Sequence, residues 1–329
     1  MNDFVFGVLA LDPKRGCDAS CIKAGFPESI SRWARSVRKH TVAATTDIAI
    51  FTGEGRGSIG NLPHGIHTQL ELDSVLQDTR VRILHGDFAD SDNRVAHSDA
   101  SRFMHCVVRN RWFVIRDYLR KHGHKYRSVL MMDIRDALVQ ADPFAWTPHA
   151  HRDAFSLHDA IVFSGEGSGS VRTLRQSRKG VPRTLQCARD AREEQKRRLL
   201  DTDPLNAGVT LGGASAFLNF STALSALIAR VTTPRCLDVK DCTDQGLYNL
   251  LVYTHWDAYL PYTRRIILPI ERAPSYTLGH RKGDLHVDAD GRIRNDVGQL
   301  PPVVHQFAKG SAGKALRRDV RFTAFLSNL

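Results

Sequence analysis

The chain has 329 residues, of which 42% are hydrophobic and 25% are charged, values typical of a globular protein with ample apolar material for a core. No apolar run reaches the roughly 18 residues of a transmembrane helix, so we expect no membrane-spanning segment. The formal net charge of +11 favours anionic ligands such as nucleotides, acidic glycans, membrane surfaces or nucleic acid.

The first half of the chain alternates predicted strands and helices. Strands are predicted at 4–11, 47–53, 81–84 and 129–132, and helices at 29–39 and 102–122. Apolar residues at helical spacing, such as Ile30, Trp33 and Val37, define the first helix. This alternation predicts a mostly parallel sheet with helices on both faces.

The second half is less regular. Extended segments are predicted at 159–163, 205–213 and 265–270, and helices at 189–200, 215–230 and 245–253. The glycine-rich stretch 164–169 lacks the Lys-Ser/Thr ending of a phosphate-binding loop, and we interpret it as a flexible loop. The helix at 189–200 mixes both charges, which indicates a solvated face rather than a nucleic-acid stripe.

Six cysteines are present, and none forms a CxxC pair, so they do not make a zinc framework. Cys236 and Cys242 could close a small disulfide loop in an oxidising compartment. Free thiols in a reducing compartment fit the sequence equally well, so the disulfide state stays open.

Two carboxylates, Asp133 and Asp136, follow the apolar strand at 129–132. Open α/β folds bind their ligands at the carboxyl ends of strands. Oxygen ligands at that edge suit Mg²⁺ or Mn²⁺, which in turn holds a diphosphate. Residues that begin a loop or cap a helix would give the same local pattern.

Four segments then occur in a characteristic order, at 133–136, 205–208, 244–246 and 303–307. Residues 133–144, DIRDALVQADPF, fit the pattern D-x-R-D-x-x-x-Q-x-D-P-F at each fixed position. In this order the segments resemble glycosyltransferases of the GT-A fold. The layout is nearest to the glycogenin and lipopolysaccharide-galactosyltransferase family and to small algal, viral and bacterial relatives, over about residues 1–310.

The resemblance implies an α/β fold of the GT-A type in a single domain over 1–329. A nucleotide-binding half would cover about 1–145 and an acceptor half about 146–329. The implied activity is a metal-dependent hexosyl or pentosyl transfer from a nucleoside-diphosphate sugar, expected to be a UDP-sugar. The acceptor would be a hydroxyl group of a glycan or another molecule.

The resemblance also implies a metal site. Asp133 and Asp136 would stand at its D-x-D position, and His305 would supply a third ligand. Mn²⁺ or Mg²⁺ is expected, and Mn²⁺ tolerates the nitrogen ligand better than Mg²⁺ does. The two carboxylates are separated by two residues instead of one, so both need not touch the metal. The spacing of Asp136 to Asp142 and Pro143 fits the family better than that of Asp133, so Asp136 is the ligand to keep if only one carboxylate contacts the metal.

Asp244 and Gln245 resemble the D-Q pair near the reacting centre of the family. Asp244 would be the base of an inverting enzyme or a positioning group in a retaining one, and it could also be a plain helix cap. Glu166 is the other candidate base. The implied donor-binding residues are Phe6, Gly7, Thr52, Arg102, Asn206, Gly208 and Lys309, of which the two cationic ones would neutralise the leaving diphosphate.

An alternative stays open, in which the chain is a catalytically inactive, basic glycan- or nucleic-acid-binding protein on the same fold. No recognised nucleic-acid motif occurs, so we expect no nucleic-acid partner. The transferred sugar, the acceptor, the stereochemical outcome and the oligomeric state are not determined by the sequence. The compartment is also open, and a soluble protein of the cytoplasm is the expectation.

Overall fold

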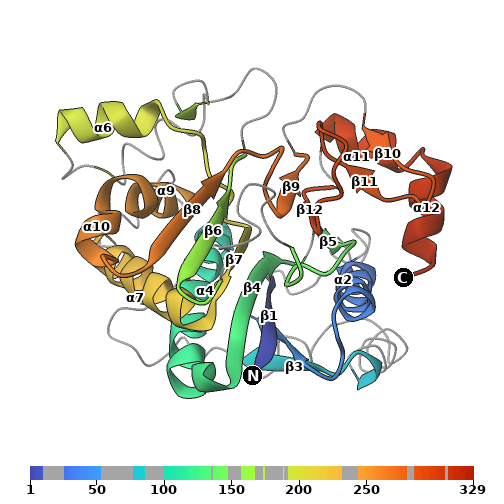
Figure 1. The fold of residues 1–329 in the computed structure, drawn as a ribbon, viewed down its shortest axis with the longest axis horizontal. Helices are drawn as coiled ribbons and strands as arrows, with labels where there is room; N and C mark the ends of the chain where they lie inside the picture. Colours follow the sequence, from blue (N-terminus) through green and yellow to red (C-terminus); the bar gives the residue numbers. More distant parts are fainter. Residues whose placement is uncertain are drawn as a thin grey trace.

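The computed structural model describes residues 1–9, 26–52, 77–85, 100–134, 136–146, 157–166, 173–174, 188, 192–231, 244–279, 285–307 and 310–329. A seven-stranded sheet lies at the centre, in the order β3-β2-β1-β4-β7-β6-β8 (Figure 1). Neighbouring strands are parallel except where β7 pairs with β4 and with β6. The predicted α/β architecture with a mostly parallel sheet is confirmed.

The strands of the central sheet agree with the predicted segments to within a few residues. They are β1 (Asn2–Leu9), β2 (Thr46–Thr52), β3 (Val81–His85), β4 (Tyr126–Asp133), β6 (Ala160–Ser164), β7 (Val209–Gly213) and β8 (Arg264–Leu268). The predicted strand at 265–270 is shorter than expected, because β8 ends before Pro269, which has no N–H for a sheet.

Helices cover both faces of the sheet, as predicted. On one face lie α4 (Ala100–His122), α7 (Ala214–Val231) and α9 (Asp244–Leu250). Their aromatic side chains pack with Phe163 of β6 in one core cluster, in which Trp112 and Phe220 meet edge to face. The other face is covered by α2 (Phe26–His40), whose Trp33 is fully buried in a second cluster.

A small second sheet, β5-β12-β9, lies beside α2 (Figure 1). It consists of β5 (Ala137–Val139), β12 (Val303–His305) and β9 (Ser275–Thr277). The strand β12 runs antiparallel to β5 and parallel to β9. The sheet therefore brings His305 next to the chain that leaves β4.

The C-terminal part builds a third core. A hairpin of β10 (His286–Val287) and β11 (Ile293–Arg294) encloses the predicted tight turn, and Gly291 adopts a φ of 79° in it. Buried Gln140 ties this hairpin to β5, donating to the carbonyls of Ile293 (2.7 Å) and Pro301 (2.8 Å). The helices α11 (Gly310–Leu316) and α12 (Val320–Ser327), which we did not predict, close the chain.

Two predicted helices differ from the observed ones. The mixed-charge helix α6 spans Glu193–Leu200, later than predicted, because Arg192 is extended at its N-cap. The helix predicted at 245–253 is α9, followed by a π-turn, η4 (Leu251–His255), and by α10 (Trp256–Tyr259). Among the helices that the structure describes, none is long and apolar enough to cross a membrane.

Candidate functional site

The candidate site lies at the edge of the central sheet where β4 and β6 end. Because β7 runs opposite to both strands, the residues that precede it arrive at this same edge. The N–H of Asp133 donates to the Gly208 carbonyl (2.8 Å), and the N–H of Asn206 donates to the Ser164 carbonyl (2.8 Å). Three segments far apart in sequence are thereby joined by backbone hydrogen bonds.

Asp133, Asp136 and His305 converge there, each with a ligand atom within 4.8 Å of those of the others. The Nε2 atom of His305 is 3.4 Å from an Asp133 oxygen and 3.5 Å from an Asp136 oxygen. It is buried and has no hydrogen-bond partner in the described structure. Ligands about 2.1 Å from one ion at right angles stand about 3 Å apart, so this spacing suits a common cation.

The charges around His305 also favour a cation. Burial lowers the pKa of His305, but the carboxylates of Asp133 and Asp136 outweigh burial and raise it, and Glu166 acts in the same direction. Among the residues that the structure describes, the carboxylates of Asp133, Asp136, Glu166 and Asp244 outnumber the buried guanidinium group of Arg111 at this edge. A divalent cation would reduce this excess of negative charge.

Gly208 leaves room for the cluster. A Cβ atom at this position would lie 2.6 Å from Cε1 of His305 and 2.7 Å from an Asp133 carboxylate oxygen. Both distances are too short for any side chain, so this position is crowded, and the candidate metal ligands cause the crowding. Gly208 lets them approach the start of β7.

Asn206 holds the other side of the His305 ring. Its Oδ1 accepts the N–H of Gly208 (2.7 Å), and its Nδ2 donates to Thr277 (2.6 Å) and lies 2.9 Å from Nδ1 of His305. In this orientation of the Asn206 amide, Nδ1 of His305 accepts a hydrogen bond, and the ring proton of His305 is on Nε2. A metal on Nε2 requires the proton on Nδ1, and the amide must then present its oxygen to the ring.

Arg111 is the residue that our sequence analysis missed. It lies on α4 and is 2% exposed. Its Nη1 donates to Asp133 (2.8 Å), and its Nη2 donates to the Ala207 carbonyl (2.8 Å) and to Asp244. A sequence signal existed, because Arg111 lies four residues before Ile115 in the apolar stripe of a predicted helix.

The predicted catalytic residues also meet at this edge. Asp244 is the first residue of α9 and is buried against Arg111. The side chain of Gln245 donates to Glu166 (2.5 Å) and to the Leu205 carbonyl (2.8 Å). These polar groups lie on the side of the cluster that faces β6 and α9.

The remaining donor-binding predictions stay untested. Phe6 is fully buried in the core, so only its backbone could meet a ligand. Gly7 is crowded by Trp33, which a Cβ atom would meet at 2.7 Å, so packing alone explains this glycine. Thr52 ends β2 and Arg102 lies on α4, but their side chains are outside the described residues. The structure does not describe Lys309, nor Cys236 and Cys242.

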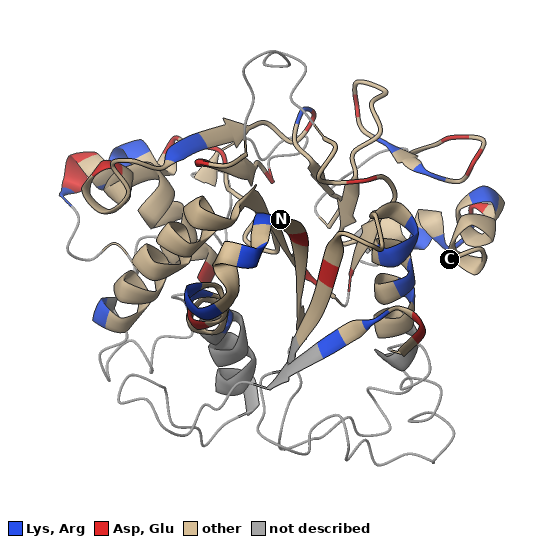
Figure 2. Cartoon of the chain, turned by 60° about the horizontal axis from the view of Figure 1, so that its bottom comes forward, with Lys and Arg blue, Asp and Glu red and all other residues tan. Residues whose placement is uncertain are grey.

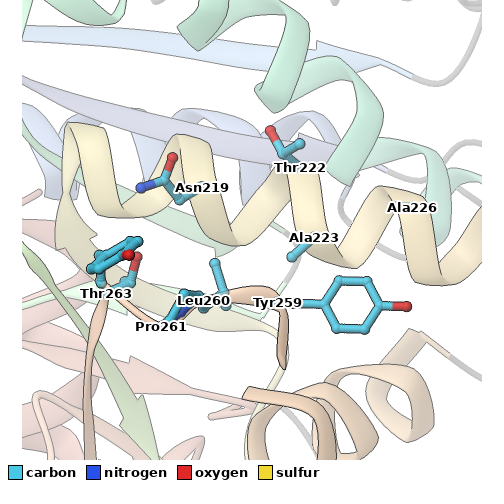
Figure 3. A pocket seen from close by; sticks show the side chains of 9 residues that line it. Asn219, Thr222, Ala223, Ala226, Tyr259, Leu260, Pro261 and Thr263 are labelled. Atoms are coloured by element: carbon cyan, nitrogen blue, oxygen red, sulfur yellow. The ribbon is translucent and has the colours of Figure 1, made fainter. Parts of the chain in front are cut away.

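A separate hollow of about 350 Å³ lies between α7 and the turn at 259–263 (Figure 3). Asn219 and Thr222 line it from α7, and Tyr259 and Pro261 from the turn. Because the turn precedes β8, the hollow is at the sheet edge opposite the carboxylate cluster. Among the described residues, no charged side chain lines it, so its described lining lacks the groups that would hold a diphosphate.

Comparisons with solved structures give distant likenesses, one of them to a xylosyltransferase. No family model matches the chain, and no curated protein matches it. The chain is similar to the crystal structure of mouse xyloside xylosyltransferase 1 in its apo form, at 9% identity and a TM-score of 0.46. The match covers 92% of this chain and 96% of that chain. A likeness at this distance does not define an activity, so the evidence for function is the site itself.

Proposed function

We propose that this protein is a metal-dependent glycosyltransferase. It moves a sugar from a nucleoside-diphosphate sugar, which we expect to be a UDP-sugar, to a hydroxyl group of a glycan or another acceptor. The observation that carries the proposal is the convergence of Asp133, Asp136 and His305 at the end of a central strand. The fit of residues 133–144 to the pattern D-x-R-D-x-x-x-Q-x-D-P-F supports it.

The three converging side chains fit a divalent cation, and Mn²⁺ suits a mixed oxygen and nitrogen donor set. Asp133, Asp136 and His305 would hold it. When bound, the ion would neutralise the negative charge that develops on the leaving diphosphate. The buried Nε2 atom of His305 and the absence of a side chain at Gly208 are the features of this chain that favour such a ligand.

Arg111 would keep the site rigid. Its guanidinium group contacts one metal-site carboxylate, Asp133, and one carboxylate beside the acceptor, Asp244. Because Arg111 is buried, its position does not depend on solvent or on a flexible loop. We assign to it the role of a positioning residue that fixes the distance between the two carboxylates.

The same contact bears on the role of Asp244. One of its carboxylate oxygens accepts from the buried guanidinium group of Arg111, so that oxygen is already engaged in an ion pair. We therefore favour the positioning role of Asp244 over the role of base. Glu166, held by Gln245, is the candidate base that remains.

The proposal is tested by measuring release of nucleoside diphosphate from UDP-, GDP- and dTDP-sugars with Mn²⁺, Mg²⁺ or EDTA. We expect metal-dependent release that Asp136→Asn abolishes. Asp142→Asn is the matched control, because Asp142 lies on the same stretch outside the cluster, where its side chain accepts the N–H of Phe144 (2.9 Å). Binding of a donor without release would indicate that the acceptor is missing from the assay.

The proposal is wrong if no donor is turned over and calorimetry detects no metal-dependent donor binding. Salt-dependent binding of nucleic acid under those conditions would favour the inactive, basic binding protein instead. In the described part of the chain, Lys and Arg residues are spread over several helices and do not form one stripe (Figure 2), which favours the enzyme.

A further inference from the structure

The hollow between α7 and the turn at 259–263, which we call the α7 hollow, has the size of a ligand site (Figure 3). Its volume of about 350 Å³ lies within the roughly 300–1,000 Å³ of small-molecule pockets. One wall is a single face of α7, on which Asn219, Thr222, Ala223 and Ala226 follow one another at helical spacing. The two alanines leave room beside the two polar side chains.

The turn that forms the other wall is held by hydrogen bonds. The N–H of Leu260 donates to the Trp256 carbonyl (2.7 Å), and the N–H of Thr263 donates to the Leu260 carbonyl (3.1 Å). The indole N–H of Trp256 donates to the Thr263 carbonyl (2.9 Å). The hydroxyl of Tyr259 accepts from Arg230 (3.3 Å), which lies outside the lining. The hollow is therefore formed before a ligand arrives, which reduces the entropy cost of binding.

Three side chains that line the α7 hollow have no hydrogen bond or ring contact within the described part of the chain. Thr263 is only 6% exposed, and its hydroxyl has no hydrogen-bond partner there. The amide of Asn219 has none either. Tyr262 is 94% exposed, and no described aromatic ring stacks on it. A buried hydroxyl without a partner is costly, and a polar ligand that binds it removes this cost.

We propose that the α7 hollow binds an uncharged sugar unit of a glycan. The C–H groups on one face of a sugar ring carry a partial positive charge, and the face of the Tyr262 ring is negative, so the two faces attract each other. The sugar hydroxyls would meet the amide of Asn219 and the hydroxyl of Thr263, which can each donate and accept. The hydroxyl of Thr222 already donates to the Leu218 carbonyl (2.7 Å), so it would accept.

Other classes of ligand fit this lining less well. None of the described lining residues is charged, so a phosphate or carboxylate group would find no cation among them. A purely apolar ligand would cover the hydroxyl of Thr263 without giving it a partner. A sugar ring combines an apolar face with hydroxyl groups, which matches an aromatic ring beside amide and hydroxyl groups.

The α7 hollow is separate from the candidate active site. The strand β8 runs parallel to β6 and begins directly after Thr263. The hollow therefore lies at the edge of the sheet where β6 and β8 begin, whereas the carboxylate cluster lies where β6 ends. The inference does not depend on the proposed glycosyltransferase activity, and a variant of the metal site separates the two.

Saturation-transfer NMR on the full chain tests the proposal with the methyl pyranosides of glucose, galactose, mannose and xylose. Sorbitol and cyclohexylmethanol are the control compounds. Sorbitol has hydroxyl groups but no fixed ring face, and cyclohexylmethanol has a ring but a single hydroxyl group. We expect at least one pyranoside to bind saturably, and about ten-fold more tightly than either control. Absence of binding by all four pyranosides, or equal binding of a control compound, would overturn the proposal.

Variants then place the binding in the α7 hollow. Tyr262→Ala should weaken pyranoside binding about five-fold or more, because the stacking partner is lost, whereas Tyr262→Phe keeps the ring and should retain binding. Both variants should keep the wild-type Tm, because this side chain is exposed. Ala226→Leu should fill the hollow and remove binding. Ser215→Leu is its control, since Ser215 is exposed on the same helix but does not line the hollow.

Unchanged binding in Tyr262→Ala, or equal losses in Ala226→Leu and Ser215→Leu, would contradict the sugar site. Asp136→Asn should leave pyranoside binding unchanged. A loss of binding in that variant would place the sugar at the carboxylate cluster and also overturn the proposal. Binding that depends on Tyr262 in a protein that turns over no donor would support the sugar site and count against the proposed glycosyltransferase alone.

Discussion

Arg111 shows how a single buried charge can organise this site. Its guanidinium group contacts Asp133, Asp244 and the Ala207 carbonyl, so it connects β4, α9 and the start of β7. Burial lowers the pKa of Arg111, but Asp244 and Asp133 outweigh burial and raise it, so the group stays charged. Removing one partner of such a network leaves charges buried without compensation.

Arg111→Met should therefore destabilise the protein by about 3 kcal/mol, because two carboxylates lose their shared cation. Donor turnover should fall as well. Arg116→Met is the control, since Arg116 is on the same helix but pairs with the exposed Asp117 and should change stability by less than about 0.5 kcal/mol. Urea unfolding measures the stability of both variants. Similar losses of stability in the two variants would contradict a special role for Arg111.

At the same scale, sequence reasoning brought together the three candidate metal ligands and missed the buried arginine that contacts one of them. Asp133, Asp136 and His305 were predicted to meet from the order of motifs, and they do. Arg111 was overlooked because an arginine in an apolar helical stripe contradicts the usual burial pattern. Only the facing carboxylates, which lie elsewhere in the chain, explain its burial.

Among the elements, the long strands and helices with a regular apolar pattern could be predicted, and the three-residue strand β9 could not. It is buried along its whole length, so it does not show the alternation of a half-buried strand. The strand β9 is Ser-Tyr-Thr, which carries little apolar signal. Its place beside β12 depends on pairing, which a local pattern does not contain.

The last helix shows a local signal that can be tested. Asp319 caps α12 by accepting the backbone N–H groups of Arg321 (2.9 Å) and Phe322 (3.2 Å). The side chain of Arg321 and these N–H groups lower the pKa of Asp319 below its ordinary value. The cap is therefore fully effective above the unfolded pKa of about 3.9 and is lost as the pH falls through the lower folded pKa.

We expect Asp319→Ala to cost about 1 kcal/mol at pH 7, and this cost should shrink below about pH 4 as the wild-type carboxylate is protonated. Asp319→Asn keeps an acceptor that does not titrate, so its advantage over alanine should not depend on pH. Urea unfolding between pH 7 and pH 3 gives these differences. A cost of Asp319→Ala that stays constant over that range would argue against the charged cap.

For the whole molecule, the acidic edge of the sheet has a thermodynamic consequence. Asp133 and Asp136 come close together, and Asp244 and Glu166 add further negative charge. Folding brings these like charges together, and their repulsion lowers the stability of the folded state. A cation that binds only the folded state offsets this repulsion and stabilises the protein. A cation held by residues of β4, the β4–β5 connection and β12 would thus stabilise both sheets at once.

Mn²⁺ at about one hundred times its Kd should stabilise the wild-type protein by about 2.7 kcal/mol, seen as a higher Tm that EDTA reverses. Gly208→Ala should lose this shift, because its Cβ atom would occupy the space beside His305. Gly123→Ala is the matched control, since its Cβ atom would meet only Leu119 at 3.8 Å. An unchanged metal response in Gly208→Ala would place the ion elsewhere.

The antiparallel strand β7 restricts where residues can be inserted into this chain or deleted from it. At its start, Gly208 accepts a hydrogen bond from Asp133, and at its end α7 begins at the next residue, without a loop. An inserted or deleted residue between Gly208 and Ala214 would therefore reverse the faces of β7 or shift α7 by about 100° around its axis. Variation in length among descendants of this protein is expected outside that interval, so residues 206–214 are suited to serve as the fixed reference for aligning them.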